Sequence, residues 1–163
     1  MAKLTAVTAL AAAAATGSMA VPSAHAATTQ ASISASTRHV QAATAATDTF
    51  PLDNTDPIDT GCWDANAYIA AAAPIYDYPT GNLLGYVRNW YSPDCGTNWS
   101  EVYTADGSSN YLGPWVYRQS DNHSTPAFTL YGNDAYSNQL YAPDAVACAV
   151  GQIGNLSNNS ACA

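Results

Sequence analysis

The stretch that decides the fold is RNWYSPDCGTNWSEVY, residues 88–103, because it contains two alternating segments joined by a turn. The turn is SPDCG, residues 92–96, in which Pro and Gly favour a reversal of the chain. Residues 83–92 before it and 97–104 after it alternate with a period of two, as strands do. Both faces of the first segment are partly apolar, which favours a central strand. We therefore interpret this aromatic stretch as a turn, pinned by Cys95, between two core strands.

The same signals recur on both sides of this stretch. PTGN at 79–82 is a turn that makes a hairpin with the preceding strand. Two segments are compatible with short helices: 62–66, as a helix or turn, and 143–153, where Pro143 suits a first helical turn. The pattern predicts a mainly β, single-domain sandwich or barrel of about six short antiparallel strands with one or two short helices. The other strands are expected at 75–78, 111–120, 127–132 and 135–142.

The N-terminus has the features of a secretory signal peptide. Lys3 precedes a short Ala-rich apolar run, and Ala24-His25-Ala26 matches a cleavage signal, so we expect cleavage after Ala26 and secretion. An uncleaved anchor is the alternative. Residues 27–49 are mostly Ala, Thr and Ser, so we expect a disordered leader, followed by one domain over 50–163. No other stretch approaches the roughly 20 apolar residues of a membrane span.

The charge of the chain excludes some classes of partner. Loss of Lys3, the only lysine, leaves three arginines against twelve acidic residues, a formal charge of −9. Binding to nucleic acid or to anionic lipid requires a cationic surface, so neither partner is expected. The composition is compatible with a well-solvated extracellular protein, which we expect to be a monomer.

The cysteines predict disulfides and no metal. An exported chain with four cysteines favours two disulfides over a zinc site, because no pair has C-x-x-C spacing and His123 is the only histidine after residue 49. A group of acidic and amide side chains near residue 55 lacks the spacing of a calcium loop, so we interpret it as solvated turn residues. The cysteines are Cys62, Cys95, Cys148 and Cys162; the acidic group is Asp53, Asn54, Asp56 and Asp59. No cofactor is expected.

The sequence offers no strong catalytic constellation. His123 and Ser124 are adjacent, with Asp121 nearby, but neighbours in a turn point apart and do not make a triad. Glu101, the only glutamate, and Asp94 are a weak pair for glycoside hydrolysis, since acids on a strand face are usually solvated. We therefore expect no enzyme activity.

The tryptophans supply a second interpretation. Four tryptophans are enough for a platform on which sugar rings stack, although aromatic side chains in a small β domain more often fill the core. The candidate platform residues are Trp63, Trp90, Trp99 and Trp115.

Three segments carry a resemblance to a known family. TDPIDTGCWDA at 55–65, YVRNWYSPDCGTNW at 86–99 and YAPDAVACA at 141–149 resemble a small secreted bacterial, mainly actinobacterial, domain-of-unknown-function family, numbered twenty-six ninety. The resemblance covers about residues 55–150, and its YSPDCGTNW block is fairly specific. It implies a compact, exported domain and no enzymatic activity.

The resemblance also bears on the disulfides, for which four cysteines allow three pairings. Family members usually carry a cysteine shortly before the DP motif, where this chain has none, and this chain instead has Cys162 near its end. If the missing cysteine normally pairs with the counterpart of Cys148, Cys162 replaces it. A Cys62–Cys95 bridge would then clamp the entry to the central strand. We predict Cys62–Cys95 and Cys148–Cys162.

These observations favour a secreted, non-catalytic domain of unknown molecular function. The first alternative is a carbohydrate- or cell-wall-binding module that uses exposed Trp and Tyr side chains. The second is a small extracellular protease inhibitor that presents the loop around Cys95.

Overall fold

A computed structural model describes residues 38–39 and 50–163. The predicted signal peptide, its predicted cleavage site and all of the predicted leader except Arg38 and His39 lie outside the described residues. The described residues form eleven strands: β1 Arg38–His39, β2 Tyr68–Tyr76, β3 Leu83–Ser92, β4 Thr97–Thr104, β5 Asn110–Arg118, β6 His123–Ser124, β7 Leu130–Gly132, β8 Asp134–Tyr136, β9 Leu140–Tyr141, β10 Ala147–Ile153 and β11 Ser157–Cys162.

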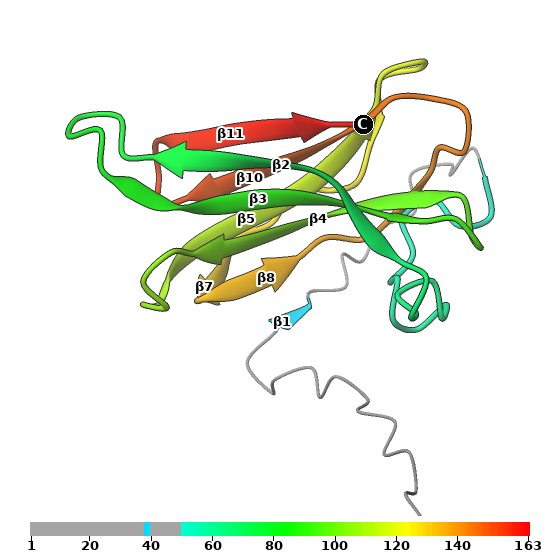
Figure 1. Ribbon diagram of the computed structural model, residues 1–163, viewed down its shortest axis with the longest axis horizontal. Coiled ribbons are helices and arrows are strands. Elements are labelled where there is room, and N and C mark those ends of the chain that lie inside the picture. Colours follow the sequence, from blue (N-terminus) through cyan, green and yellow to red (C-terminus); the bar gives the residue numbers. More distant parts are fainter. Residues whose placement is uncertain (1–37, 40–49) are drawn as a thin grey trace, which may run out of the picture. The chain divides into compact units, whose positions relative to one another are not determined.

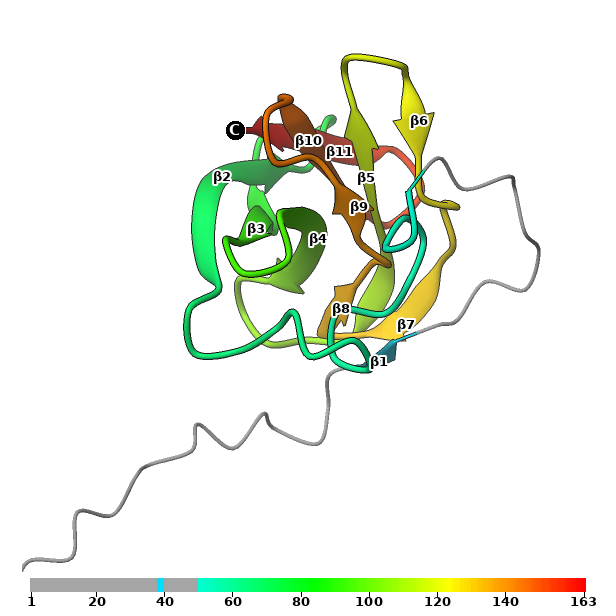
Figure 2. The ribbon, with the colours of Figure 1, turned by 90° about the vertical axis from the view of Figure 1, so that its right-hand side faces the viewer.

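The strands form two sheets that pack face to face (Figures 1 and 2). The first sheet has the order β1-β8-β4-β3-β2, with β9 also paired to β4. The second sheet has the order β11-β10-β5-β6, with β7 also paired to β5. All strand pairs of the described residues are antiparallel except β1 with β8. These two strands run parallel, and β1 lies at the edge of the first sheet.

The mainly β fold is confirmed, and β3 and β4 have the bounds expected from the sequence. The expected number of about six strands is too low for the described residues, because the segment expected as one strand at 135–142 forms β8 and β9, and β10 and β11 occupy the expected helix and tail. The helix expected at 143–153 is wrong: a turn leads into β10, and the polar tail after it forms β11. Helix propensity is a weak preference that strand pairing on both sides of β10 overrides. Residues 62–66 form turns. No helix among residues 38–39 and 50–163 is long and apolar enough to cross a membrane.

The interior between the sheets is narrow where β10 crosses β3 and β4. A Cβ atom on Gly151 would lie 2.7 Å from Val87 Cβ and 2.7 Å from Val102 Cγ2. Glycine therefore allows the two sheets to approach closely. Both valines are fully buried, and they belong to one apolar cluster with Ile75, Leu112, Ala135, Ala149, Ile153 and Ala161.

Two disulfides fix the ends of the domain, in the pairing expected from the sequence. Cys62 is bonded to Cys95 across 33 residues, and Cys148 is bonded to Cys162 across 14 residues. The first connects the irregular segment 50–67, which we call the entry segment, to the turn between β3 and β4. The second joins directly opposed residues of β10 and β11.

Candidate functional site: an aromatic surface on the first sheet

The outer side of the first sheet carries most of the candidate site. Inward-facing residues of β3 and β4, such as Val87 and Val102, are fully buried, so the residues between them point away from the second sheet. Cross-strand register places Tyr86 opposite Tyr103, Arg88 opposite Glu101, and Trp90 opposite Trp99. On the next strand Tyr136 lies opposite Glu101. We call these seven side chains, together with Trp63 from the entry segment, the aromatic face.

Three tryptophans pack together at one end of the aromatic face. The Trp90 and Trp99 rings are nearly parallel, with centroids 6.2 Å apart. Trp63 lies 5.4 Å from each of them and meets Tyr136 edge-on at 5.1 Å. Trp99 is fully buried, and its Nε1 donates to no described residue, whereas Trp63 and Trp90 are half-buried. Trp99 is therefore the base of the cluster, and the other two tryptophans reach solvent.

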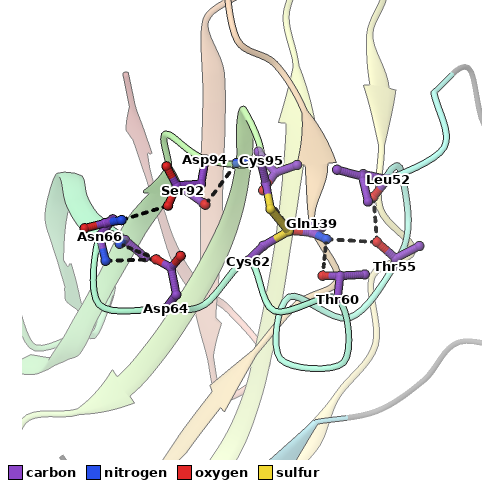
Figure 3. Close-up of a disulfide and its surroundings, with 12 residues drawn as sticks. Leu52, Thr55, Thr60, Cys62, Asp64, Asn66, Ser92, Asp94, Cys95 and Gln139 are labelled. Atoms are coloured by element: carbon purple, nitrogen blue, oxygen red, sulfur yellow. Dashed lines mark hydrogen bonds between the residues drawn. A yellow bond between two sulfur atoms is a disulfide. The ribbon is translucent and has the colours of Figure 1, made fainter.

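Trp63 is positioned by the entry segment, which has no regular secondary structure of its own. The neighbouring Cys62 is bonded to Cys95 (Figure 3). The buried Gln139 side chain donates to the hydroxyls of Thr55 and Thr60, as the same view shows. The backbone N–H of Trp63 donates to the carbonyl of Pro57. These attachments hold the indole against the sheet.

A charged pair lies in the middle of the aromatic face. Arg88 Nη1 donates to Glu101 Oε2 at 3.1 Å, and the same oxygen accepts a bond from Trp90 Nε1 at 2.8 Å. Arg88 Nη2 donates to the Tyr103 hydroxyl at 3.0 Å, and the guanidinium lies 4.2 Å from the centre of that ring. The Arg88 side chain is 32% exposed and the Glu101 side chain 8%. The acid is thus largely covered, while the guanidinium remains accessible.

The protonation states of the face are set by burial and by neighbouring charge. Burial raises the pKa of the Tyr136 hydroxyl, and the nearby carboxylates of Asp56 and Asp59 raise it further, so this phenol stays neutral. Burial alone would lower the pKa of Arg88, but attraction to Glu101 outweighs it and the pKa lies above its ordinary value. The phenol of the buried Tyr136 is therefore neutral, and the Arg88 guanidinium carries a fixed positive charge.

The structure brings together three of the four platform tryptophans expected from the sequence. Trp115 lies on β5 of the second sheet, opposite Val150, and is separate from the other three. Sequence reasoning did not assign Tyr86, Tyr103 and Tyr136 to a site. The alternation along 83–92 and 97–104 indicated the positions of the first two. It places Tyr86 on the same side of its strand as Trp90, and Tyr103 on the same side of its strand as Trp99.

The weak catalytic candidates are engaged in other contacts. Asp94 accepts a bond from Asn66 on the turn before β4, whereas Glu101 lies in mid-strand beside Arg88. The Asp121 carboxylate is paired with Arg118 at 2.7 Å. His123 Nε2 lies 3.8 Å from Asp53.

The acidic group near residue 55 is structural, and the expectation of solvated turn residues is wrong for Asp53 and Asp56. Asp53 is 1% exposed because it accepts bonds from Arg118 and from the backbone N–H of Tyr141. Asp56 is 9% exposed and accepts a bond from the backbone N–H of Ile58. Within residues 38–39 and 50–163, no group of three or more His, Cys, Asp or Glu side chains is arranged to hold a metal ion.

No protein-family model, no curated protein and no solved structure matches this chain.

Proposed function

We propose that this chain is a secreted, non-catalytic binding domain and that its aromatic face binds a polysaccharide of a cell wall or extracellular matrix. The observation that carries the proposal is the pair of half-buried indoles, Trp63 and Trp90, resting on the buried Trp99. Large rings held at a surface with a few polar groups beside them are typical of ligand sites.

The way in which these rings are held supports recognition. Trp90 lies on a central strand paired on both sides, and Trp63 follows a disulfide-bonded cysteine. Side chains held in advance lose little conformational freedom when a ligand binds. The two disulfides are in keeping with an oxidising, extracellular location for such a domain.

The surroundings of Glu101 count against glycoside hydrolysis by Glu101 together with Asp94. Glycoside hydrolysis uses two carboxyl groups about 5–10 Å apart that flank the scissile bond. Glu101 Oε2 already accepts bonds from Arg88 and Trp90. Glu101 is the fourth residue after Thr97 on β4, roughly 13 Å along the extended strand, and Asp94 comes before Thr97 in the chain. The protease-inhibitor hypothesis has less support. It requires an exposed loop around Cys95, but only Pro93 and Asp94 are exposed in the tight turn at 93–96.

The test is retention of the secreted protein on insoluble polysaccharides and purified bacterial cell wall. Trp90→Ala and Trp63→Ala should each weaken retention about tenfold or more, as loss of a central aromatic contact usually does. Trp115→Ala is the matched control, because it removes the same side chain from the other sheet. Far-UV circular dichroism confirms that each variant is folded. Equal loss in Trp115→Ala, or no retention of the wild type on any of these polymers, would contradict the proposal.

A further inference from the structure

The aromatic face has an ordered layout along β3. Tyr86, Arg88 and Trp90 follow one another at every second residue, so their Cα atoms span about 13 Å along one face of the strand. On β4 the aromatic residues Tyr103 and Trp99 lie opposite Tyr86 and Trp90, and Glu101 lies opposite Arg88. The Tyr86 and Tyr103 rings stack at one end with centroids 5.5 Å apart, and the tryptophan cluster occupies the other end. Along its length the aromatic face therefore has an aromatic pair, then a charged pair, then an aromatic cluster.

The charged position suits a group that both donates and accepts hydrogen bonds. Arg88 offers N–H donors from a side chain that is 32% exposed, and the half-buried Tyr103 hydroxyl, 3.0 Å from Arg88 Nη2, can both donate and accept. A hydroxyl group donates one hydrogen bond and accepts others, so neighbouring hydroxyls of a sugar ring match this pair. A carboxylate or phosphate offers no such donor when ionised.

The charge around the site disfavours an anion. Glu101 neutralises Arg88, and Asp134 of β8 lies opposite Tyr103 at the edge of the face. Arg118, the other arginine whose side chain the structure describes, is 2% exposed and paired with Asp53 and Asp121. A polyanionic chain would therefore find no unpaired cation near the aromatic face among the described side chains, and would meet acidic groups instead.

We infer that the aromatic face binds an uncharged oligosaccharide chain that lies along β3 in three adjacent subsites. One ring contacts the Tyr86–Tyr103 pair, the next hydrogen-bonds to Arg88 and the Tyr103 hydroxyl, and the third contacts Trp63 and Trp90. This inference rests on the proposed function and makes it more specific, because it fixes the charge of the ligand and the number of rings at which affinity stops rising.

The experiment is titration of the wild-type secreted protein with cello-oligosaccharides and chito-oligosaccharides of one to six rings, followed by tryptophan fluorescence. Affinity should rise at least tenfold from one ring to three and change little beyond three. Oligogalacturonates of the same lengths should bind at least tenfold more weakly than the neutral series. Equal affinity for one ring and three in both neutral series, or tighter binding of oligogalacturonates, would overturn the inference.

Variants at the two ends of the face locate the subsites. Tyr86→Ala should remove most of the gain between two and three rings and leave affinity for two rings within about twofold. Tyr111→Ala, an exposed tyrosine on the second sheet, is the matched control and should change neither value. An unchanged length profile in Tyr86→Ala, with its thermal transition intact, would overturn the three-subsite arrangement. Retention on polysaccharide without length or charge discrimination refutes this inference alone, whereas no binding to any polymer or oligosaccharide refutes the proposed function as well.

Discussion

The entry segment and the C-terminal hairpin are each closed by a disulfide, but they are held in different ways. The hairpin of β10 and β11 is a continuous antiparallel ladder, so Cys148–Cys162 repeats a connection that backbone hydrogen bonds already make. The entry segment, 50–67, has one isolated bridge, between Thr55 and Gln139. It depends on separate side-chain attachments, of which Cys62–Cys95 and the buried Asp53–Arg118 pair are the strongest.

The difference matters because Trp63 belongs to the region held by separate attachments. A strand ladder is held by many backbone hydrogen bonds, so it keeps its position when one contact is lost. An irregular segment held by a few separate contacts loses its position when one of them is removed. Changes in the entry segment should therefore disturb the aromatic face, and changes in the hairpin should lower stability while leaving that face in place.

The largest expected effect is at the ion pair. Arg118→Leu leaves the Asp53 carboxylate buried without its cation, and removal of one partner of a buried pair usually costs about 3–5 kcal/mol. Arg88→Leu is the matched control at a partly exposed pair and should cost roughly 1 kcal/mol, although Glu101 is well covered. Urea unfolding gives both values. Similar losses in the two variants would show that the entry segment does not depend on Arg118.

The two disulfides test the comparison directly. In the chain-entropy model, a 33-residue loop contributes about 4 kcal/mol and a 14-residue loop about 3 kcal/mol. Replacement of Cys62 and Cys95 by Ser should also increase acrylamide quenching of tryptophan fluorescence in the folded state, because Trp63 loses its anchor. Replacement of Cys148 and Cys162 by Ser should lower stability with no change in quenching. Equal quenching in the two double variants would refute the distinction.

The hairpin should be sensitive to packing instead. Gly151→Ala would place a methyl group 2.7 Å from the Cβ of Val87, an atom that no side-chain rotation can move away. We expect a loss of about 1–3 kcal/mol, as is usual for added volume in a packed core. Gly113→Ala on the adjacent strand meets its nearest atom at 3.4 Å and is the control. A loss below 0.5 kcal/mol, taken as a rough threshold, in Gly151→Ala would show that the sheets can separate without cost.

The comparison also explains which features were predictable from the sequence. β3 and β4 were predicted because alternation and a strong turn coincide in adjacent residues. β10 and β11 were missed because Ala-rich and polar segments carry no strand signal of their own, and pairing with β5 decides their structure. The Asp53–Arg118 contact joins residues 65 apart, and nothing in the local sequence of either residue indicates the other.

The site was predictable only in part, for a similar reason. The sequence placed Trp90 and Trp99 on neighbouring strands, but it did not distinguish Trp63 from Trp115 as their companion. The predicted Cys62–Cys95 bridge contained that information, since Trp63 follows Cys62 and Cys95 lies between Trp90 and Trp99. Tyr136 comes from a three-residue strand whose position depends on β4.

The smallest expected effect is a loss of stability at acidic pH through the Asp121 carboxylate. The hydrogen bond from Arg118, helped by the backbone N–H of His123 and by the charge attraction of Arg118, lowers the pKa of the Asp121 carboxyl to about 2 against the opposing effect of burial. Since this pKa lies below the unfolded value of about 4, the ionised carboxylate stabilises the folded state above pH 4, and that contribution is lost as the pH falls from about 4 to 2. Asp121 is partly exposed, so we expect less than about 1 kcal/mol.

Thermal unfolding of the wild type and of Asp121→Asn, followed between pH 7 and pH 2, measures this contribution. The variant should have the lower Tm by a constant difference from pH 7 to pH 5, and the difference should shrink toward zero near pH 2. Asp144→Asn, a change at an exposed carboxylate on the turn before β10, should shift Tm little at any pH. β10 and β11 contain no acidic or basic side chain, so acid should not act on the hairpin through its own residues. A Tm difference that persists unchanged at pH 2 would show that Asp121 contributes by packing and not through its charge.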